Sequence, residues 1–129
     1  MSPKGSTLTW SAAALVIAQV VHGFIPSGVD EDNGSLVGPI VGLVFLVLSL
    51  VVLYGAILDR AWAPRLAIAT GGAVAIGFVL YHAVPAKTAF SNPYPGHGAS
   101  AAGYFGVALA VAAAAWCAWD GRQAAITSA

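Results

Sequence analysis

Four long apolar stretches, separated by polar or proline-containing breaks, constrain this chain more than any other feature. They run over approximately residues 8–25, 35–58, 62–84 and 99–119. Each is close to the ~20 residues that a helix needs to cross the hydrocarbon core of a bilayer. Because lipid offers the backbone no hydrogen bonds, such a stretch must be a helix whose peptide groups bond within it. The sequence therefore predicts an all-α integral membrane four-helix bundle over residues 1–129.

The amino-acid composition supports a membrane protein rather than a soluble one. Hydrophobic residues make up 59% of the chain and charged residues 8%, whereas a soluble domain carries about 25% charged residues. A small soluble domain buries only about two-thirds of the surface of its unfolded chain, so we expect the lipid bilayer to solvate the rest. The net charge is zero and the sequence has no basic run, which argues against nucleic acid as a partner.

The positions of Lys and Arg predict the orientation. Lys4, Arg60, Arg65 and Arg122 fall on one side of the predicted crossings, and Lys87 alone falls on the other. The positive-inside rule then places both termini in the cytoplasm, in a multi-pass protein of the cell membrane. We expect the first stretch to be retained rather than cleaved as a signal peptide, because no typical cleavage site precedes Pro26. Four tryptophans fall near the cytoplasmic boundary, as interfacial anchors do: Trp10, Trp62, Trp116 and Trp119.

The two halves of the chain share a weak pattern. His22 and His82 each stand shortly before a proline, and Asp59 and Asp120 each follow the end of an apolar stretch. Equivalent positions are about 60 residues apart, which is compatible with a two-helix unit repeated once in parallel, as in some transport folds.

Three histidines are the main candidates for binding a metal ion or a cofactor. The predicted topology brings His22, His82 and His97 to the outer side, together with the acidic turn at residues 30–32. Neutral imidazoles bind Zn or Cu, with a carboxylate as a further ligand, and two histidines on facing helices can hold haem iron. Gln19 lies one turn before His22 and is expected to orient it. The alternatives are that the His22–His82 pair serves a proton-linked or quinone site, or that these imidazoles only bond water, head groups or backbone carbonyls.

Small residues and loop composition suggest further roles. Gly38 and Gly42 stand four residues apart, a spacing that lets helices approach closely within the bundle, in a homo-oligomer or in a larger membrane complex. The segment from Pro85 to Gly98 combines prolines with Phe90 and Tyr94, and it is expected either to cap a pocket or to lie on the membrane surface.

Features that the sequence lacks argue against several classes of function. No stretch carries an ionisable residue at mid-depth, which argues against an ion-coupled transporter. Asp59 and Asp120 are predicted on the side opposite the histidines, so they cannot pair with a histidine for acid–base catalysis. Cys117 is interpreted as a small apolar residue that fills space. No group of catalytic residues is therefore apparent. We therefore predict a small multi-pass membrane protein that acts as a non-catalytic packing or accessory subunit rather than an enzyme. The alternative is a metal- or haem-binding protein that uses His22 and His82 for redox or metal handling.

Overall fold

The computed structural model describes residues 3–29, 35–84, 88 and 90–128. Its helices are α1 (Pro3–Phe24), α2 (Val37–Ile57), α3 (Ala63–Ala83) and α4 (Ala101–Thr127). All four are long and apolar enough to cross a membrane, so the predicted all-α membrane bundle is confirmed. The last helix continues beyond the predicted apolar stretch, because residues such as Gln123 and Ala124 favour helix whether or not lipid surrounds them.

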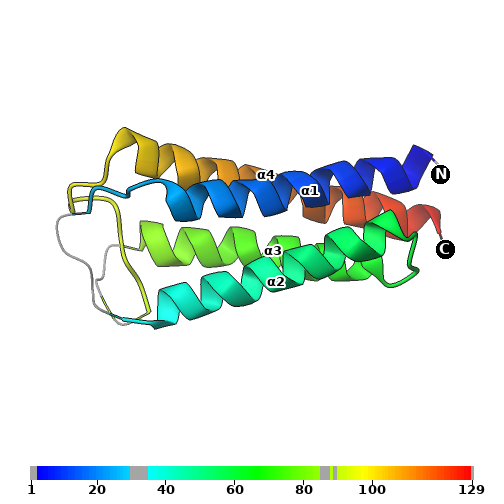
Figure 1. Ribbon diagram of the computed structural model, residues 1–129, viewed down its shortest axis with the longest axis horizontal. Helices are drawn as coiled ribbons and strands as arrows, with labels where there is room; N and C mark the ends of the chain where they lie inside the picture. Colours follow the sequence, from blue (N-terminus) through cyan, green and yellow to red (C-terminus); the bar gives the residue numbers. More distant parts are fainter. Residues whose placement is uncertain (1–2, 30–34, 85–87, 89, 129) are drawn as a thin grey trace.

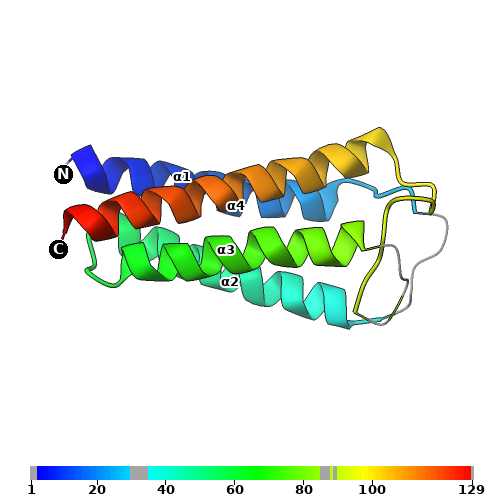
Figure 2. The ribbon, with the colours of Figure 1, turned by 180° about the vertical axis from the view of Figure 1, so that it is seen from behind.

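The helices form an up-and-down bundle in which each contacts its neighbour in the sequence, and α4 closes the ring against α1. Both chain termini and the α2–α3 turn lie at one end of the bundle, called here the terminal end (Figure 1). The α1–α2 and α3–α4 connections lie at the other end, called here the loop end. Seen from behind, α3 and α4 run side by side along the bundle (Figure 2), and they make its most extensive helix contact.

Glycine makes the close approach of α3 and α4 possible. A Cβ atom added to Gly71 would lie 2.5 Å from the Ala114 carbonyl oxygen, and one added to Gly121 would lie 2.7 Å from the Pro64 carbonyl oxygen. Both contacts are with backbone atoms, which cannot rotate away. This is the close backbone packing that small residues permit between membrane helices.

The α2–α3 turn ends α2 through backbone bonds. The Arg60 amide donates to the Gly55 carbonyl at 2.8 Å and the Asp59 amide to the Ala56 carbonyl at 3.3 Å, while Asp59 takes a positive φ of 49°. This is the pattern of a Schellman motif, which satisfies carbonyls that the helix end would leave open.

The buried apolar core is biased toward the terminal end and consists mainly of small residues. At the loop end, by contrast, the interior holds histidine and aromatic rings. The core residues are Leu8, Ala12, Leu15, Ala18, Val52, Ala56, Ala63, Ala67, Val74, Ala113, Ala114 and Cys117.

Candidate functional site

Two histidines from different helices meet inside the loop end. His22 belongs to the last turn of α1 and His82 to the last turn of α3. Their ring centroids are 5.2 Å apart, with the planes inclined at 69°. Phe78, one turn before His82, packs edge-on against His22 at 4.8 Å between centroids. The sequence places these two imidazoles at the same end of the bundle, and the structure shows that their rings are in contact.

A strap from the α3–α4 connection, residues 91–100, lies over the pair at the loop end. The Tyr94 ring contacts the His82 ring at 4.4 Å between centroids and is only 3% exposed. The Asn92 amide donates to the Tyr81 carbonyl and the Tyr94 amide to the His82 carbonyl, both at 2.8 Å. These bonds extend the end of α3 into the strap and hold it against the histidines.

The strap is also tied to the chain that follows α1. The Ser100 amide donates to the Ser27 carbonyl at 2.7 Å, and the Ser100 hydroxyl donates to the Pro26 carbonyl at 3.1 Å. The same hydroxyl accepts from the Gly103 amide at 3.0 Å, which caps the start of α4. One serine thus joins the two connections of the loop end.

Two aromatic side chains of the α3–α4 connection, Tyr94 in the strap and Phe90 before it, match the two roles expected for this segment. Tyr94 is buried against the histidines, as a cap would be, whereas Phe90 is 75% exposed, as an anchor would be. Burial raises the pKa of the Tyr94 phenol above its ordinary value, and nearby Tyr81 adds to that increase. Tyr94 therefore stays neutral over the physiological range.

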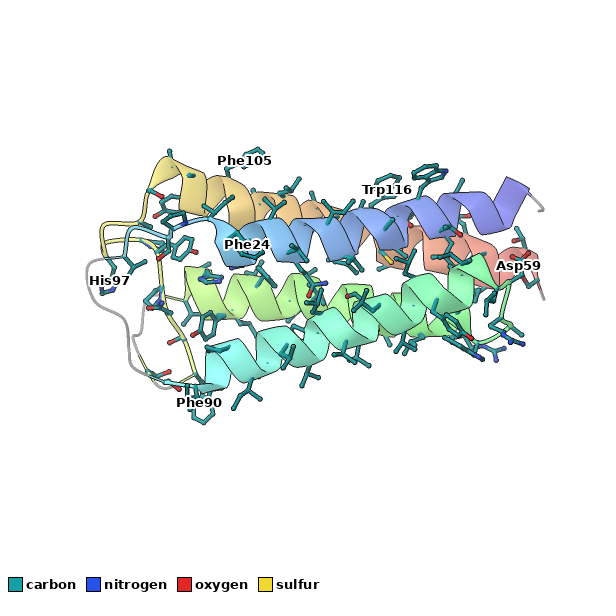
Figure 3. All side chains as sticks on the ribbon, in the orientation of Figure 1. Phe24, Asp59, Phe90, His97, Phe105 and Trp116 are labelled. Carbon is teal, nitrogen blue, oxygen red and sulfur yellow. The ribbon has the colours of Figure 1, made fainter. Side chains whose placement is uncertain are left out.

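His97 lies apart from the imidazole pair. It occupies the turn at residues 95–98, between Gly96 and Gly98, whose φ angles are 77° and 76°. Figure 3 shows its side chain at the far edge of the loop end. Within the part of the chain that the structure describes, no three His, Cys, Asp or Glu side chains gather to hold a metal ion. The acidic turn at residues 30–32 lies outside the described residues, and the metal-ligand role of His22, His82 and His97 stays a prediction.

A polar bridge joins α1 to α2 just below the histidines. The Ser49 hydroxyl donates to the Phe45 carbonyl at 2.8 Å, so its oxygen accepts the bond from Gln19 Nε2 at 2.7 Å. Nε2 also reaches the Leu15 carbonyl at 3.4 Å. We expect Gln19 to orient His22 from the sequence, but in the structure its amide nitrogen is held by Ser49, because the position three residues before His22 on α1 faces α2.

A cleft of about 780 Å³ opens beside the imidazole pair, a size typical of small-molecule sites. It is called here the lateral cleft. α1, α2, α3 and Phe90 form its walls, and apolar atoms dominate them. Its lining includes Gln19, Val20, His22, Phe24, Gly38, Val41, Gly42, Phe45, Phe78, Tyr81, His82 and Phe90.

The lateral cleft opens to the side of the bundle. Its rim carries exposed apolar side chains, with Phe24 85% exposed on α1 and Leu43 62% exposed on α2. Figure 3 shows Phe24 on α1 and Phe90 beside the start of α2. In a membrane, helix surfaces of this kind face lipid, so the opening faces lipid as well.

Gly38 and Gly42 of α2 have different surroundings. A Cβ on Gly42 would meet no atom within 4 Å, and one on Gly38 would meet the Tyr81 side chain. The spacing of these two glycines suggested close packing of backbones. Within this chain Gly42 instead leaves room in the cleft, and glycine spacing alone does not distinguish these two roles.

Comparison of the chain with protein-family models, with curated proteins and with solved structures finds no match.

Proposed function

We propose that this chain is a non-catalytic membrane protein that binds a lipophilic small molecule taken up from the bilayer. The observation that carries the proposal is the lateral cleft of about 780 Å³ between α1, α2 and α3. Ligand sites are concave and mostly apolar, with a few convergent polar groups that fix orientation. Here those groups are His22, His82 and the Gln19 amide.

The entry path supports a ligand from lipid rather than from water. The strap covers His82 at the loop end, with Tyr94 packed on its ring. The side opening lies between helices that are long and apolar enough to span a membrane. A ligand with an apolar body therefore exchanges laterally and places its polar head near the imidazoles.

The test uses two photoactivatable probes on the protein in lipid nanodiscs. Both probes carry a diazirine on a C16 chain; one ends in a primary alcohol and the other in the methyl ether of that alcohol. We expect at least one probe to label the cleft walls saturably, with labelling reduced by excess unlabelled compound. Contacts with ordinary lipid-facing surfaces should not saturate.

A matched pair of variants locates the labelling. Gly42→Phe places a ring in the cleft, and Gly72→Phe adds the same ring to a helix position outside it; neither Cβ meets an atom within 4 Å. Gly42→Phe should abolish saturable labelling, and Gly72→Phe should preserve it. Absence of saturable labelling in the unmodified protein, or its survival in Gly42→Phe, would refute the proposal.

The short distance between the imidazoles favours a metal ion as a second candidate. Zn–N bonds are about 2 Å long, and the ring centroids of His22 and His82 are 5.2 Å apart, so a small rotation lets one ion reach both rings. Haem would need its macrocycle to fit beside the pair. Elemental analysis and a visible spectrum of purified protein test both: stoichiometric Zn or Cu, or a Soret band, that is lost in His22→Ala supports this function, and colourless, metal-free protein refutes it.

The orientation and the accessory role remain part of the proposal. Lys4, Arg60, Arg65 and Arg122 belong to the terminal end, which supports cytoplasmic termini in the cell membrane. Packing in a homo-oligomer or a larger complex, and the two-helix repeat, stay predictions. Labelling of cysteines introduced at residues 30 and 60 from one side of sealed vesicles tests the orientation, and equal labelling of both would contradict it.

A further inference from the structure

The hydrogen-bonding atoms of the lateral cleft specify the head group of its ligand, and this inference rests on the proposed function. His82 Nδ1 lies 3.2 Å from the Asn92 backbone carbonyl oxygen. A carbonyl oxygen can only accept, so Nδ1 carries the hydrogen. In a neutral imidazole the other ring nitrogen, Nε2, is then an acceptor with a free lone pair.

The His82 lone pair is directed away from the strap. Nδ1 and Nε2 point in different directions from the ring, and Nδ1 faces Asn92 in the strap, which leaves Nε2 as the ring nitrogen available to the cleft that His82 lines. Among the residues that the structure describes, none donates a hydrogen bond to Nε2. A bound molecule with a hydrogen-bond donor can therefore satisfy the lone pair of His82 Nε2.

Gln19 offers a second acceptor by the same reasoning. Its Nε2 is held by Ser49, whose own hydrogen goes to the Phe45 carbonyl. That chain of bonds fixes which end of the amide points to Ser49. The side-chain carbonyl oxygen of Gln19 is the other end of this amide, and Gln19 lines the cleft. This oxygen is the second acceptor.

His22, on the α1 side of the cleft, supplies the third hydrogen-bonding group. Its Nδ1 is buried without a hydrogen-bond partner and faces α4, since a Cβ on Gly106 would lie 3.3 Å from it. Nε2 is on the other side of the ring, so His22 can present either a donor or an acceptor there. No Lys, Arg, Asp or Glu is among the described lining residues, and an ionised head group would be costly to bury.

We propose that the ligand of the lateral cleft is a neutral lipid whose head is a hydroxyl group, an alcohol or a phenol. Its O–H donates to His82 Nε2 or to the Gln19 carbonyl, and its oxygen accepts from His22. An ether or a carbonyl head can only accept, and leaves the His82 lone pair without a partner. An unmade bond of this kind is the usual basis of discrimination in apolar sites.

The alcohol and methyl ether probes test the head group directly. We expect half-saturation of the cleft at about tenfold lower alcohol than ether, the effect of one hydrogen bond of about 1.4 kcal/mol. Equal half-saturation, with labelling still blocked by Gly42→Phe, would overturn the hydroxyl assignment and leave cleft binding intact. Loss of saturable labelling by both probes would instead refute the proposed function.

A substitution at His82 separates its acceptor from its structural role. The amide nitrogen of Asn occupies nearly the position of imidazole Nδ1, so His82→Asn keeps a donor for the Asn92 carbonyl and removes Nε2. We expect this variant to bind the ether as before, and to lose most of the preference for the alcohol if the hydroxyl donates to His82; if it donates to the Gln19 side-chain carbonyl, Gln19→Leu should lose that preference instead. An unchanged preference in both His82→Asn and Gln19→Leu would contradict the assignment of these acceptors.

Discussion

Substitution of two adjacent glycines in α3 measures how closely α3 and α4 pack. Gly71→Ala and Gly72→Ala add the same methyl group to the same helix, and both gain about 1 kcal/mol of intrinsic helix propensity. At Gly72 the new Cβ meets no atom within 4 Å. At Gly71 it would lie 2.5 Å from the Ala114 carbonyl oxygen and 2.8 Å from the Ala118 amide nitrogen.

The expected difference follows from that geometry. The Cβ at residue 71 meets backbone on α4, so the two helices must separate by roughly an ångström, and overpacking of this kind costs about 1–3 kcal/mol. Because the propensity gain is common to both variants, it cancels in the comparison. We expect the free energy of unfolding of Gly71→Ala to be about 1–3 kcal/mol lower than that of Gly72→Ala.

Reversible unfolding by SDS in mixed micelles, followed by tryptophan fluorescence, provides the free energies. The intact protein and the Gly72→Ala variant are the references. Equal free energies of unfolding for the two variants would refute the close approach of α3 and α4. A methyl group at residue 71 would then meet no more resistance than one at residue 72.

Two further predictions concern the bridge and the strap at the loop end. Ser49→Ala removes the acceptor of Gln19 Nε2, whose bond to the Ser49 hydroxyl is 2.7 Å long, and should lower the free energy of unfolding by about 0.5–1.5 kcal/mol in the same SDS titration; no change would show that the bridge adds no stability. Burial raises the pKa of Tyr94 in the fold, so the folded state holds this proton more tightly than the unfolded chain, whose tyrosine pKa is about 10. Stability is therefore complete below about pH 10 and falls as the pH rises toward the folded-state pKa. Tyr94→Phe should reduce this alkaline loss in thermal unfolding between about pH 9 and 11, and identical pH profiles would contradict it.

The sequence predicted the bundle well because length and hydropathy alone decide it. Lipid forces each apolar stretch into a helix, and the order of crossings then places His22 and His82 at one end. Helix ends were less predictable. The helix α4 extends to Thr127 because its polar tail favours helix without needing lipid.

Helix rotation and helix spacing were not readable from such uniformly apolar segments. The topology brought three histidines to one end, but only the packing of α1 against α3 and α4 decides that His22 meets His82 while His97 stays in a turn. The lateral cleft depends on the distance between α1 and α2 at the loop end. Gly42, whose spacing from Gly38 suggested a helix contact, instead faces open space.

The side opening of the cleft determines how its ligand must be dosed. A molecule that arrives through lipid competes for the site according to its mole fraction among the lipids, not its molarity in the buffer. Compounds that bind the cleft equally well will therefore rank by water-to-membrane partition coefficient when added from solution. Adding empty vesicles will dilute the ligand and lower occupancy, although neither the protein nor the total amount of ligand has changed.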